Sequence, residues 1–207
     1  MESDIKVAAI ILAAGRAERM GAHKLLLPLG GKPLLAWSVA AACASDARPV
    51  IVALGRDAES VAAALPPGPY ITVVNQRFAE GMGTTLALAV SQLPADVAGT
   101  LVLLGDQPFM PVAAIEAVLA AARHEPDRIA MGARDGQRGH PVYLPRRVFG
   151  RLLALRADEG ARTIIAAERD SVTLVPIAAE HAMLDVDTLE DYQRALRLTH
   201  SPGNMPS

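Results

Sequence analysis

The chain has 207 residues, a formal net charge of -2 and a single cysteine, Cys43. This length is sufficient for one substantial core, and the charge pattern excludes the basic stripe that holds a nucleic-acid backbone. One thiol without a partner predicts a core residue in a reducing compartment rather than a disulfide framework. The apolar run at residues 7–14 is too short to span a bilayer, and the N-terminus lacks the pattern of a secretory signal. We therefore expect a cytoplasmic protein with neither nucleic acid nor membrane as a partner.

Short apolar runs alternate with longer segments of helical periodicity along most of the chain. Continuous apolar runs bounded by Gly, Pro or Asp are typical of parallel strands covered on both faces, so we expect central strands at residues 7–12, 50–54, 71–74, 100–104 and 129–132. Helices are expected at residues 33–44, 58–65 after an Asp57 cap, 84–93, 111–123, 146–155 and 188–198, the last beginning with a near capping box, Thr188 to Asp191. The alternation predicts an α/β fold, a three-layer α/β/α sandwich with a mostly parallel, Rossmann-like sheet. Residues 1–198 are expected to form one domain, followed by a disordered tail at 199–207.

The loop after the first predicted strand has the composition of a phosphate-binding loop. Ligands of open α/β sheets bind beyond the carboxyl ends of the strands, where small residues let backbone N–H groups approach a phosphate. Arg19 can bind two phosphate oxygens at once, and Lys24 supplies a compact charge. A solvated basic loop is the alternative for this segment alone. The residues expected to bind a nucleotide here are Leu12, Ala13, Ala14, Gly15, Arg19 and Lys24.

Two other phosphate-binding motifs are missing from the sequence. The pattern G-x-x-x-x-G-K-[ST] does not occur, and no G-x-G-x-x-G follows a predicted strand. These absences argue against P-loop enzymes, kinases and dinucleotide-dependent oxidoreductases.

Acidic residues from the later half of the chain predict a magnesium site. Asp106 follows the strand at 100–104, and it lies beside the first loop if the two strands are neighbours. Mg2+ commonly takes one or two carboxylates together with substrate phosphates and water. Asp187 is the preferred second ligand, although Asp185 projects to the same face of an extended segment and stays open. The alternatives are a turn-forming Asp106 and a helix-capping Asp187. No Cys pair or H-E-x-x-H motif indicates zinc.

The motifs Leu12-Ala-Ala-Gly-x-x-x-Arg19-Met-Gly-x-x-Lys24 and Gly31-Lys-Pro-Leu34 resemble the signature of nucleotidyltransferases that activate sugars, isoprenoids and the molybdenum cofactor. With the segments at residues 75–86, 138–142 and 157–162, they resemble molybdenum cofactor cytidylyltransferases and the related molybdopterin-guanine dinucleotide synthases. The resemblance implies a nucleotide-diphospho-sugar transferase type of fold, with Mg2+ as cofactor. The implied roles are catalysis by Arg19, Lys24 and Asp106, metal binding by Asp106 and Asp187, nucleotide contacts from Asn75, Gly83, Thr84 and Asp106, and acceptor contacts from His140, Pro141 and Arg162.

The implied reaction is transfer of CMP from CTP to the terminal phosphate of molybdopterin, with release of pyrophosphate. The guanylyl enzymes tend to have Gly where this chain has Ala14, so the resemblance favours CTP over GTP. For His140 the alternative is a polar residue in a tight Gly-His-Pro turn. Four other functions stay open: a GTP-using molybdopterin guanylyltransferase, a transferase for sugar or polyol phosphates, a non-catalytic escort of the molybdenum cofactor, and a nicotinamide-dependent oxidoreductase. A molybdenum hydroxylase is the client enzyme that the resemblance suggests.

Overall fold

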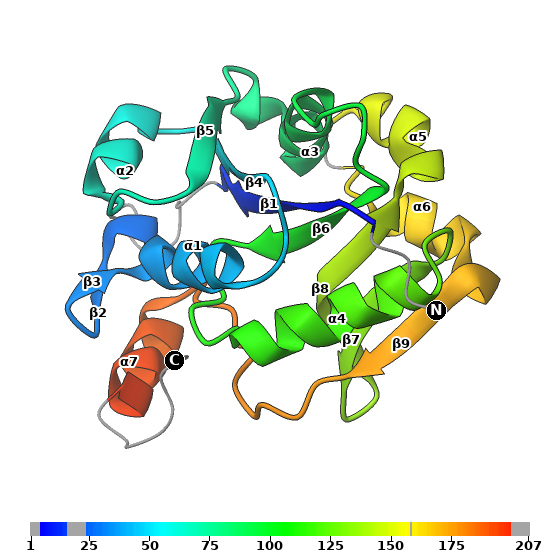
Figure 1. Ribbon diagram of the computed structural model, residues 1–207. Coiled ribbons are helices and arrows are strands. Elements are labelled where there is room, and N and C mark those ends of the chain that lie inside the picture. The colour runs from blue at the N-terminus through cyan, green and yellow to red at the C-terminus, as the bar shows by residue number, and fades with distance from the viewer. Residues whose placement is uncertain (1–4, 16–23, 158, 200–207) are drawn as a thin grey trace.

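A seven-stranded sheet in the order β5-β4-β1-β6-β8-β7-β9 forms the centre of the structure (Figure 1). The structure is a computed structural model that describes residues 5–15, 24–157 and 159–199. Strands β5, β4, β1 and β6 are parallel neighbours, whereas β8 runs antiparallel to both β6 and β7. The strands are β1 (Val7–Ala13), β4 (Val50–Leu54), β5 (Tyr70–Val74), β6 (Gly99–Leu104), β7 (Ile129–Arg134), β8 (Gln137–Pro145) and β9 (Val172–Pro176), and a separate hairpin joins β2 (Pro28–Leu29) to β3 (Lys32–Pro33).

Helices cover both faces of the sheet, and the side chains of β1 show how. Val7, Ala9 and Ile11 are buried in the core under α1 and α4, whereas Ala8 and Ile10 are buried in the opposite core under α3 and α5. This alternation follows from the two-residue period of a strand, and it requires apolar residues at every position. The helices are α1 (Leu34–Ala44), α2 (Ala58–Ala64), α3 (Met82–Ser91), α4 (Val112–His124), α5 (Phe149–Leu153), α6 (Arg162–Ala167) and α7 (Leu189–Thr199), with 3-10 turns η1 (Lys24–Leu26), η2 (Phe78–Glu80), η3 (Arg146–Val148) and η4 (Arg169–Ser171).

The predicted three-layer α/β/α sandwich with a mostly parallel sheet is confirmed, but the prediction of only central strands is wrong. Strand β5 lies at an edge of the sheet, where Ile71 and Val74 are exposed. The segment 146–155 is a 3-10 turn followed by a short helix rather than one continuous helix. Asp57 precedes α2 with a φ of 53° but makes no capping hydrogen bond through its side chain. The last helix does begin with a capping box, described with the site below.

Strand β8 was missed by the sequence analysis because Pro141 lies within it. Proline has no N–H for the ladder, so it argues against a strand in the interior of a sheet. The pairing of β8 with β7 shifts at this point, from Met131 opposite Val142 to Gly132 opposite Gly139. His140 and Pro141 fall in the irregularity, where no ladder bond is needed. His140 therefore belongs to a bulged strand, and the alternative of a tight Gly-His-Pro turn is wrong.

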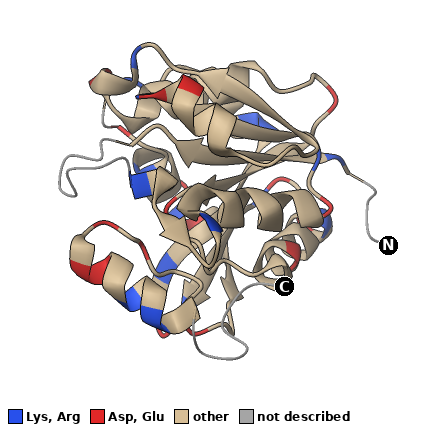
Figure 2. Ribbon diagram, turned by 90° about the vertical axis from the view of Figure 1, so that its left-hand side faces the viewer, with Lys and Arg blue, Asp and Glu red and all other residues tan. Residues whose placement is uncertain are grey.

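The surface shows charges of both signs. In Figure 2, Lys and Arg are interspersed with Asp and Glu over the ribbon. Within the described ranges, no helix has both the length and the apolar character to cross a membrane. Cys43 is a free thiol, half-buried against the core that contains α1, and desolvation raises its pKa.

Candidate active site

The candidate site lies at the carboxyl ends of β1 and β6, which are parallel neighbours with Leu12 opposite Leu104. The Gly105 N–H donates a hydrogen bond to the Leu12 carbonyl oxygen at 3.0 Å, so the loops after the two strands begin in contact. A β-carbon at position 105 would lie 2.7 Å from Leu35 Cδ1 and 3.2 Å from that same Leu12 oxygen. Glycine is therefore required for the close approach that brings Asp106 beside the first loop.

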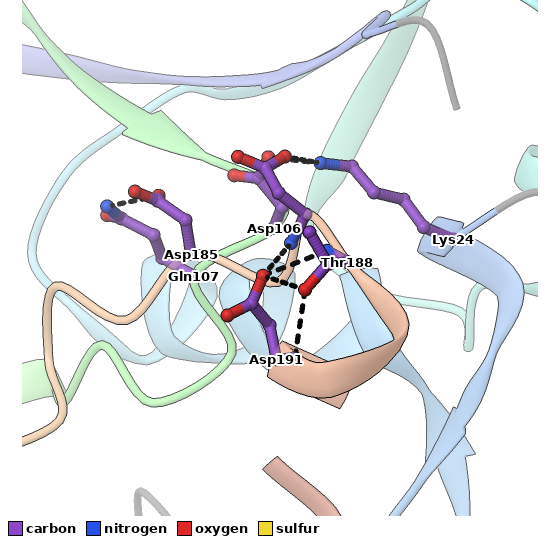
Figure 3. A network of polar contacts seen from close by, with 7 residues as sticks. Lys24, Asp106, Gln107, Asp185, Thr188 and Asp191 are labelled. Carbon is purple, nitrogen blue, oxygen red and sulfur yellow. Dashed lines mark hydrogen bonds and ion pairs between the residues drawn. The ribbon is translucent and has the colours of Figure 1, made fainter. Parts of the chain in front are cut away.

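Three charged side chains from distant parts of the sequence converge at this edge and form what we call the acid–lysine cluster: Lys24, Asp106 and Asp187. Figure 3 shows the Lys24 side chain pointing toward Asp106. The Lys24 ammonium donates hydrogen bonds to Asp106 Oδ2 and to Asp187 Oδ1, each at 2.7 Å. Lys24 is nearly buried, whereas half of the Asp187 side chain is exposed. Burial alone would lower the pKa of Lys24, but the attraction and hydrogen bonds of Asp106 and Asp187 outweigh it and raise the pKa.

The two carboxylates of the cluster suit a divalent cation. Both contact one ammonium nitrogen, so they are close enough to share a single positive ion. No group of three or more His, Cys, Asp or Glu side chains in the described ranges has the geometry of a metal site. Mg2+ does not need one, because substrate phosphates and water complete its six oxygen ligands. Asp106 and Asp187 are the residues that would hold it.

A hydrogen-bonded framework fixes Asp187 in the cluster. The Val186 N–H donates to the Asp106 backbone oxygen at 3.0 Å, and the Val186 side chain is fully buried. Asp191 Oδ2 accepts hydrogen bonds from the N–H groups of Asp187 and Thr188, at 3.2 and 2.9 Å, and from the Thr188 hydroxyl at 2.7 Å. The Asp191 N–H donates in return to Thr188 Oγ1 at 3.1 Å. This reciprocal pair is the predicted capping box, now confirmed, and it begins α7 directly after Asp187.

Beside the cluster lies a cavity of about 370 Å3, here called the β1 pocket. The predicted nucleotide-binding residues Leu12, Ala13, Ala14, Gly15, Lys24 and Asp106 all line it. Arg19, the other predicted cation, lies outside the described residues. Gly81 and Met82, in the turn that by resemblance helps to seat the base, also line it. The sequence analysis gave no individual role to Phe78 and Thr85, which line the pocket from η2 and α3. Phe78 and Thr85 both lie in the segment at residues 75–86 that carries the resemblance, but an apolar lining residue such as Phe78 has no spacing signal of its own.

Asn75, Gly83 and Thr84 do not line the β1 pocket. The buried Asn75 amide donates to the hydroxyls of Thr84 and Thr85, at 2.9 and 2.8 Å, and so ties the end of β5 to α3. The Gly83 N–H donates to the Ala157 oxygen at 3.0 Å, and a β-carbon at position 83 would lie 2.8 Å from that oxygen. These residues therefore fix the position of α3, which carries the lining residue Thr85, without lining the β1 pocket themselves.

A larger cavity of about 670 Å3, here called the β8 pocket, adjoins the first. Both pockets are lined by Leu12, Met82 and Leu104. The predicted acceptor residues His140 and Arg162 line the β8 pocket, whereas Pro141 is buried and does not. Desolvation lowers the pKa of His140 to about 4, and the positive charge of Arg162 adds to this effect, so the imidazole is neutral at pH 7.

Two polar residues of the β8 pocket are close in sequence to members of the acid–lysine cluster. Gln107 follows Asp106, and Asp185 lies two positions before Asp187. Gln107 Nε2 donates to Asp185 Oδ1 at 2.9 Å, on the side of the site away from Lys24 in Figure 3. Desolvation raises the pKa of Asp185, the Gln107 hydrogen bond opposes the rise, and the nearby carboxylates Asp106 and Asp187 add to it. Asp185 thus contacts Gln107 while Asp187 contacts Lys24, which favours Asp187 over Asp185 as the metal ligand. Sequence reasoning gave Gln107 no role, and its place directly after Asp106 was the available signal.

Comparisons with known proteins show the family to which the chain belongs. Residues 9–172 match the family model described as the MobA-like NTP transferase domain. The nicotine blue oxidoreductase of Paenarthrobacter nicotinovorans is 30% identical over 204 residues, which span 92% of this chain and 96% of that protein. The crystal structure of Rv0371c from Mycobacterium tuberculosis H37Rv is similar with a TM-score of 0.84 at 29% identity, over 94% of this chain and all of that one. The structure of Rv0371c in complex with manganese has a TM-score of 0.80 at 27% identity, over 93% of this chain and 98% of that one. The chain therefore belongs to the MobA-like NTP transferase family, and it is a nucleotidyltransferase of that family.

Proposed function

We propose that the protein catalyses Mg2+-dependent transfer of CMP from CTP to the terminal phosphate of molybdopterin, with release of pyrophosphate. One observation carries this proposal: Lys24 and Asp106 of the acid–lysine cluster line the β1 pocket, and Gln107, the residue after Asp106, lines the adjoining β8 pocket. Two substrates that react with each other need two sites with charged groups between them. The β1 pocket is the site for the nucleotide and the β8 pocket is the site for the acceptor.

The reaction requires little acid–base chemistry from the protein. An oxygen of the acceptor phosphate attacks the α-phosphorus of CTP, the bond to the β-phosphate oxygen breaks, and pyrophosphate leaves with that electron pair. A phosphate monoester has its second pKa near 6, so the attacking oxygen is mostly ionised at neutral pH. The absence of a general base among the cluster residues is consistent with this. The main requirement is to bring two polyanions together.

Lys24 supplies part of the compensating positive charge. Its ammonium is nearly buried, and because its pKa is raised it stays protonated at neutral pH. An ammonium desolvated in this way interacts with phosphate oxygens more strongly than one in water. Mg2+ held by Asp106 and Asp187 would neutralise charge on the triphosphate and on the leaving pyrophosphate. Rv0371c is a similar protein, and its structure in complex with manganese contains a divalent cation, which supports this assignment.

Ala14 supports a preference for CTP. Its methyl group packs against Gly55, where an added β-carbon would lie 2.8 Å from Ala14 Cβ and 2.7 Å from Phe78 Cβ. Ala14 and Phe78 both line the β1 pocket. Because Ala14 lines the β1 pocket, its methyl group leaves less room for a base than a glycine would, and cytosine is smaller than guanine.

The similar protein named nicotine blue oxidoreductase favours a second candidate function, reduction of an aromatic substrate by a nicotinamide cofactor. The missing G-x-G-x-x-G motif argues against it. Oxidation of NADH or NADPH in the presence of an aromatic acceptor, without any nucleoside triphosphate, would support this function over nucleotidyl transfer.

The test is a panel of pyrophosphate-release assays in which CTP or GTP is combined with molybdopterin or with a polyol phosphate, in the presence of Mg2+. The proposal expects fastest release with CTP and molybdopterin and a cytidine dinucleotide as product. Asp106→Asn and Lys24→Met are each expected to lower the rate about 100-fold or more, as for removal of one charge-stabilising group. Asp96→Asn is the control, because Asp96 pairs with Lys6 at an exposed position and lines neither pocket. Full activity of Asp106→Asn would refute the proposal, and molybdopterin binding without turnover would indicate an escort.

A further inference from the structure

The wall of the β8 pocket contains a buried polar side chain whose hydrogen bonding is incomplete. Gln107 is 4% exposed, and its Nε2 donates to Asp185 Oδ1 at 2.9 Å. Gln107 Oε1 is buried and has no hydrogen-bond partner among the described residues. Leaving a buried acceptor unpaired loses its hydration without a replacing hydrogen bond, so folded proteins rarely retain one without a reason.

The contacts around Gln107 hold the residue in place and leave Oε1 without a donor. Its backbone oxygen accepts hydrogen bonds from Ser38 Oγ at 3.2 Å and from the Met110 N–H at 3.3 Å, which fixes the main chain. Rotating the amide by 180° would place Oε1 against the Asp185 carboxylate, so two acceptors would face each other. The orientation with Nε2 toward Asp185 is therefore the favoured one, and Oε1 is left for a donor from outside the protein.

The rest of the β8 pocket indicates what kind of molecule brings that donor. Beside Gln107, Asp185 adds a carboxylate that accepts hydrogen bonds but donates none. The lining also carries the charged side chains of Arg138, Glu159 and Arg162. Gln137, His140 and Thr163 are further polar residues of the lining. Much of the remainder is apolar, including Leu86, Val102, Met131, Val142, Leu144 and Ile165.

The apolar part of this lining suits the face of a flat unsaturated ring better than a polyol, whose hydroxyls would face hydrocarbon there, and the polar residues are left for the edge of the ring. Two adjacent acceptors require two adjacent donors. We infer that Gln107 and Asp185 together recognise the acceptor substrate, and that they do so by accepting hydrogen bonds from neighbouring N–H groups on the edge of a planar heterocycle. This inference rests on the proposed function, because it assigns the β8 pocket to the acceptor.

The probes are pterin and lumazine, two fluorescent bicyclic rings. Pterin presents a ring N–H beside an exocyclic amino group, whereas lumazine has a carbonyl in place of that amino group. Fluorescence quenching titrations with the purified full chain measure both affinities. The wild type is expected to bind pterin about tenfold more tightly than lumazine, a difference of about 1.4 kcal/mol, because lumazine leaves a buried acceptor unpaired.

The variants separate recognition from general damage. Gln107→Met keeps the size of the side chain but removes both amide groups, and it is expected to weaken pterin binding about tenfold and to abolish the preference over lumazine. Gln137→Met is the matched control, because Gln137 lines the same pocket at an exposed position. Asp185→Asn provides a second test at an exposed position in case Gln107→Met does not fold, and it is expected to weaken pterin binding without weakening Mn2+ binding. CTP affinity is expected to stay within about twofold in all three variants.

Equal affinities of the wild type for pterin and lumazine, or undetectable binding of both, would overturn the inference. So would unchanged pterin affinity in folded Gln107→Met and in Asp185→Asn. Failure of the proposed function can be distinguished from failure of this inference. Selective pterin binding without pyrophosphate release supports the inference and refutes the transfer reaction, whereas pyrophosphate release with a polyol phosphate, unaffected by Gln107→Met, refutes the inference alone.

Discussion

The capping box at the start of α7 allows a prediction about both stability and metal binding. In Asp191→Ala, the N–H groups of Asp187 and Thr188 and the Thr188 hydroxyl lose their common acceptor, Asp191 Oδ2. Loss of an N-terminal cap costs about 0.5–2 kcal/mol, typically about 1. The charge near the positive end of the helix dipole adds about 0.3–1 kcal/mol.

The expected total is therefore about 1–2 kcal/mol, which corresponds to a fall in Tm of about 2–8 °C for a domain of this size. The helix is expected to stay docked, because Tyr192 donates to the Pro28 oxygen at 2.6 Å and Ala195 is fully buried. Asp187 becomes less ordered, so the affinity for Mn2+ should also fall. Thermal unfolding and titration calorimetry with Mn2+ measure the two effects.

Glu190→Ala is the matched control for this experiment. Glu190 lies in the same first turn and is exposed, so its removal takes away a charge near the helix end without removing the cap. The expected loss is at most about 1 kcal/mol, with no change in Mn2+ affinity. If Asp191→Ala and Glu190→Ala had the same Tm and the same Mn2+ affinity, the argument that the cap fixes Asp187 would be refuted.

Three further predictions concern stability. Gly83→Ala places a β-carbon 2.8 Å from the Ala157 oxygen, so it is expected to lower the free energy of unfolding in urea by about 1–3 kcal/mol. Gly150→Ala is the control, because its β-carbon would meet no atom within 4 Å, and equal urea midpoints for the two variants would contradict the prediction. Tyr143→Phe removes the hydroxyl of a fully buried side chain, whose single proton is shared between the backbone oxygens of Pro126 and Ala98, at 2.8 and 3.3 Å. A loss of about 1–2 kcal/mol is expected by the same method, and an unchanged midpoint would show that this hydrogen bonding adds nothing. Because His140 has its pKa lowered to about 4, the unfolded chain takes up the proton first, so this residue removes stability as the pH falls from about 6.5 to 4. His140→Gln should flatten the fall of Tm over that pH range, and an unchanged pH profile would show that the imidazole is not held neutral.

The parallel half of the sheet could be predicted from the sequence because its signal is local. Residues 50–54 are apolar at every position and became β4 with the predicted bounds, since a strand covered on both faces needs no polar side chain. The Thr188 to Asp191 capping box was equally readable, because a cap depends on residues three apart. The convergence of Lys24 and Asp106 needed one further assumption, that the strands before them are neighbours.

The rest depended on the tertiary structure. The bulge around Pro141 is possible only because β7 shifts its register opposite it, which no local pattern records. Asn75, Gly83 and Thr84 belong to a nucleotide-binding motif by resemblance, yet their contacts hold α3 and the chain near Ala157 in place. Gln107 and Asp185 are 78 positions apart, and only the folded chain places them together in one pocket wall. Local sequence determines which backbone conformation each segment favours, whereas the partner of a polar side chain depends on how distant segments pack.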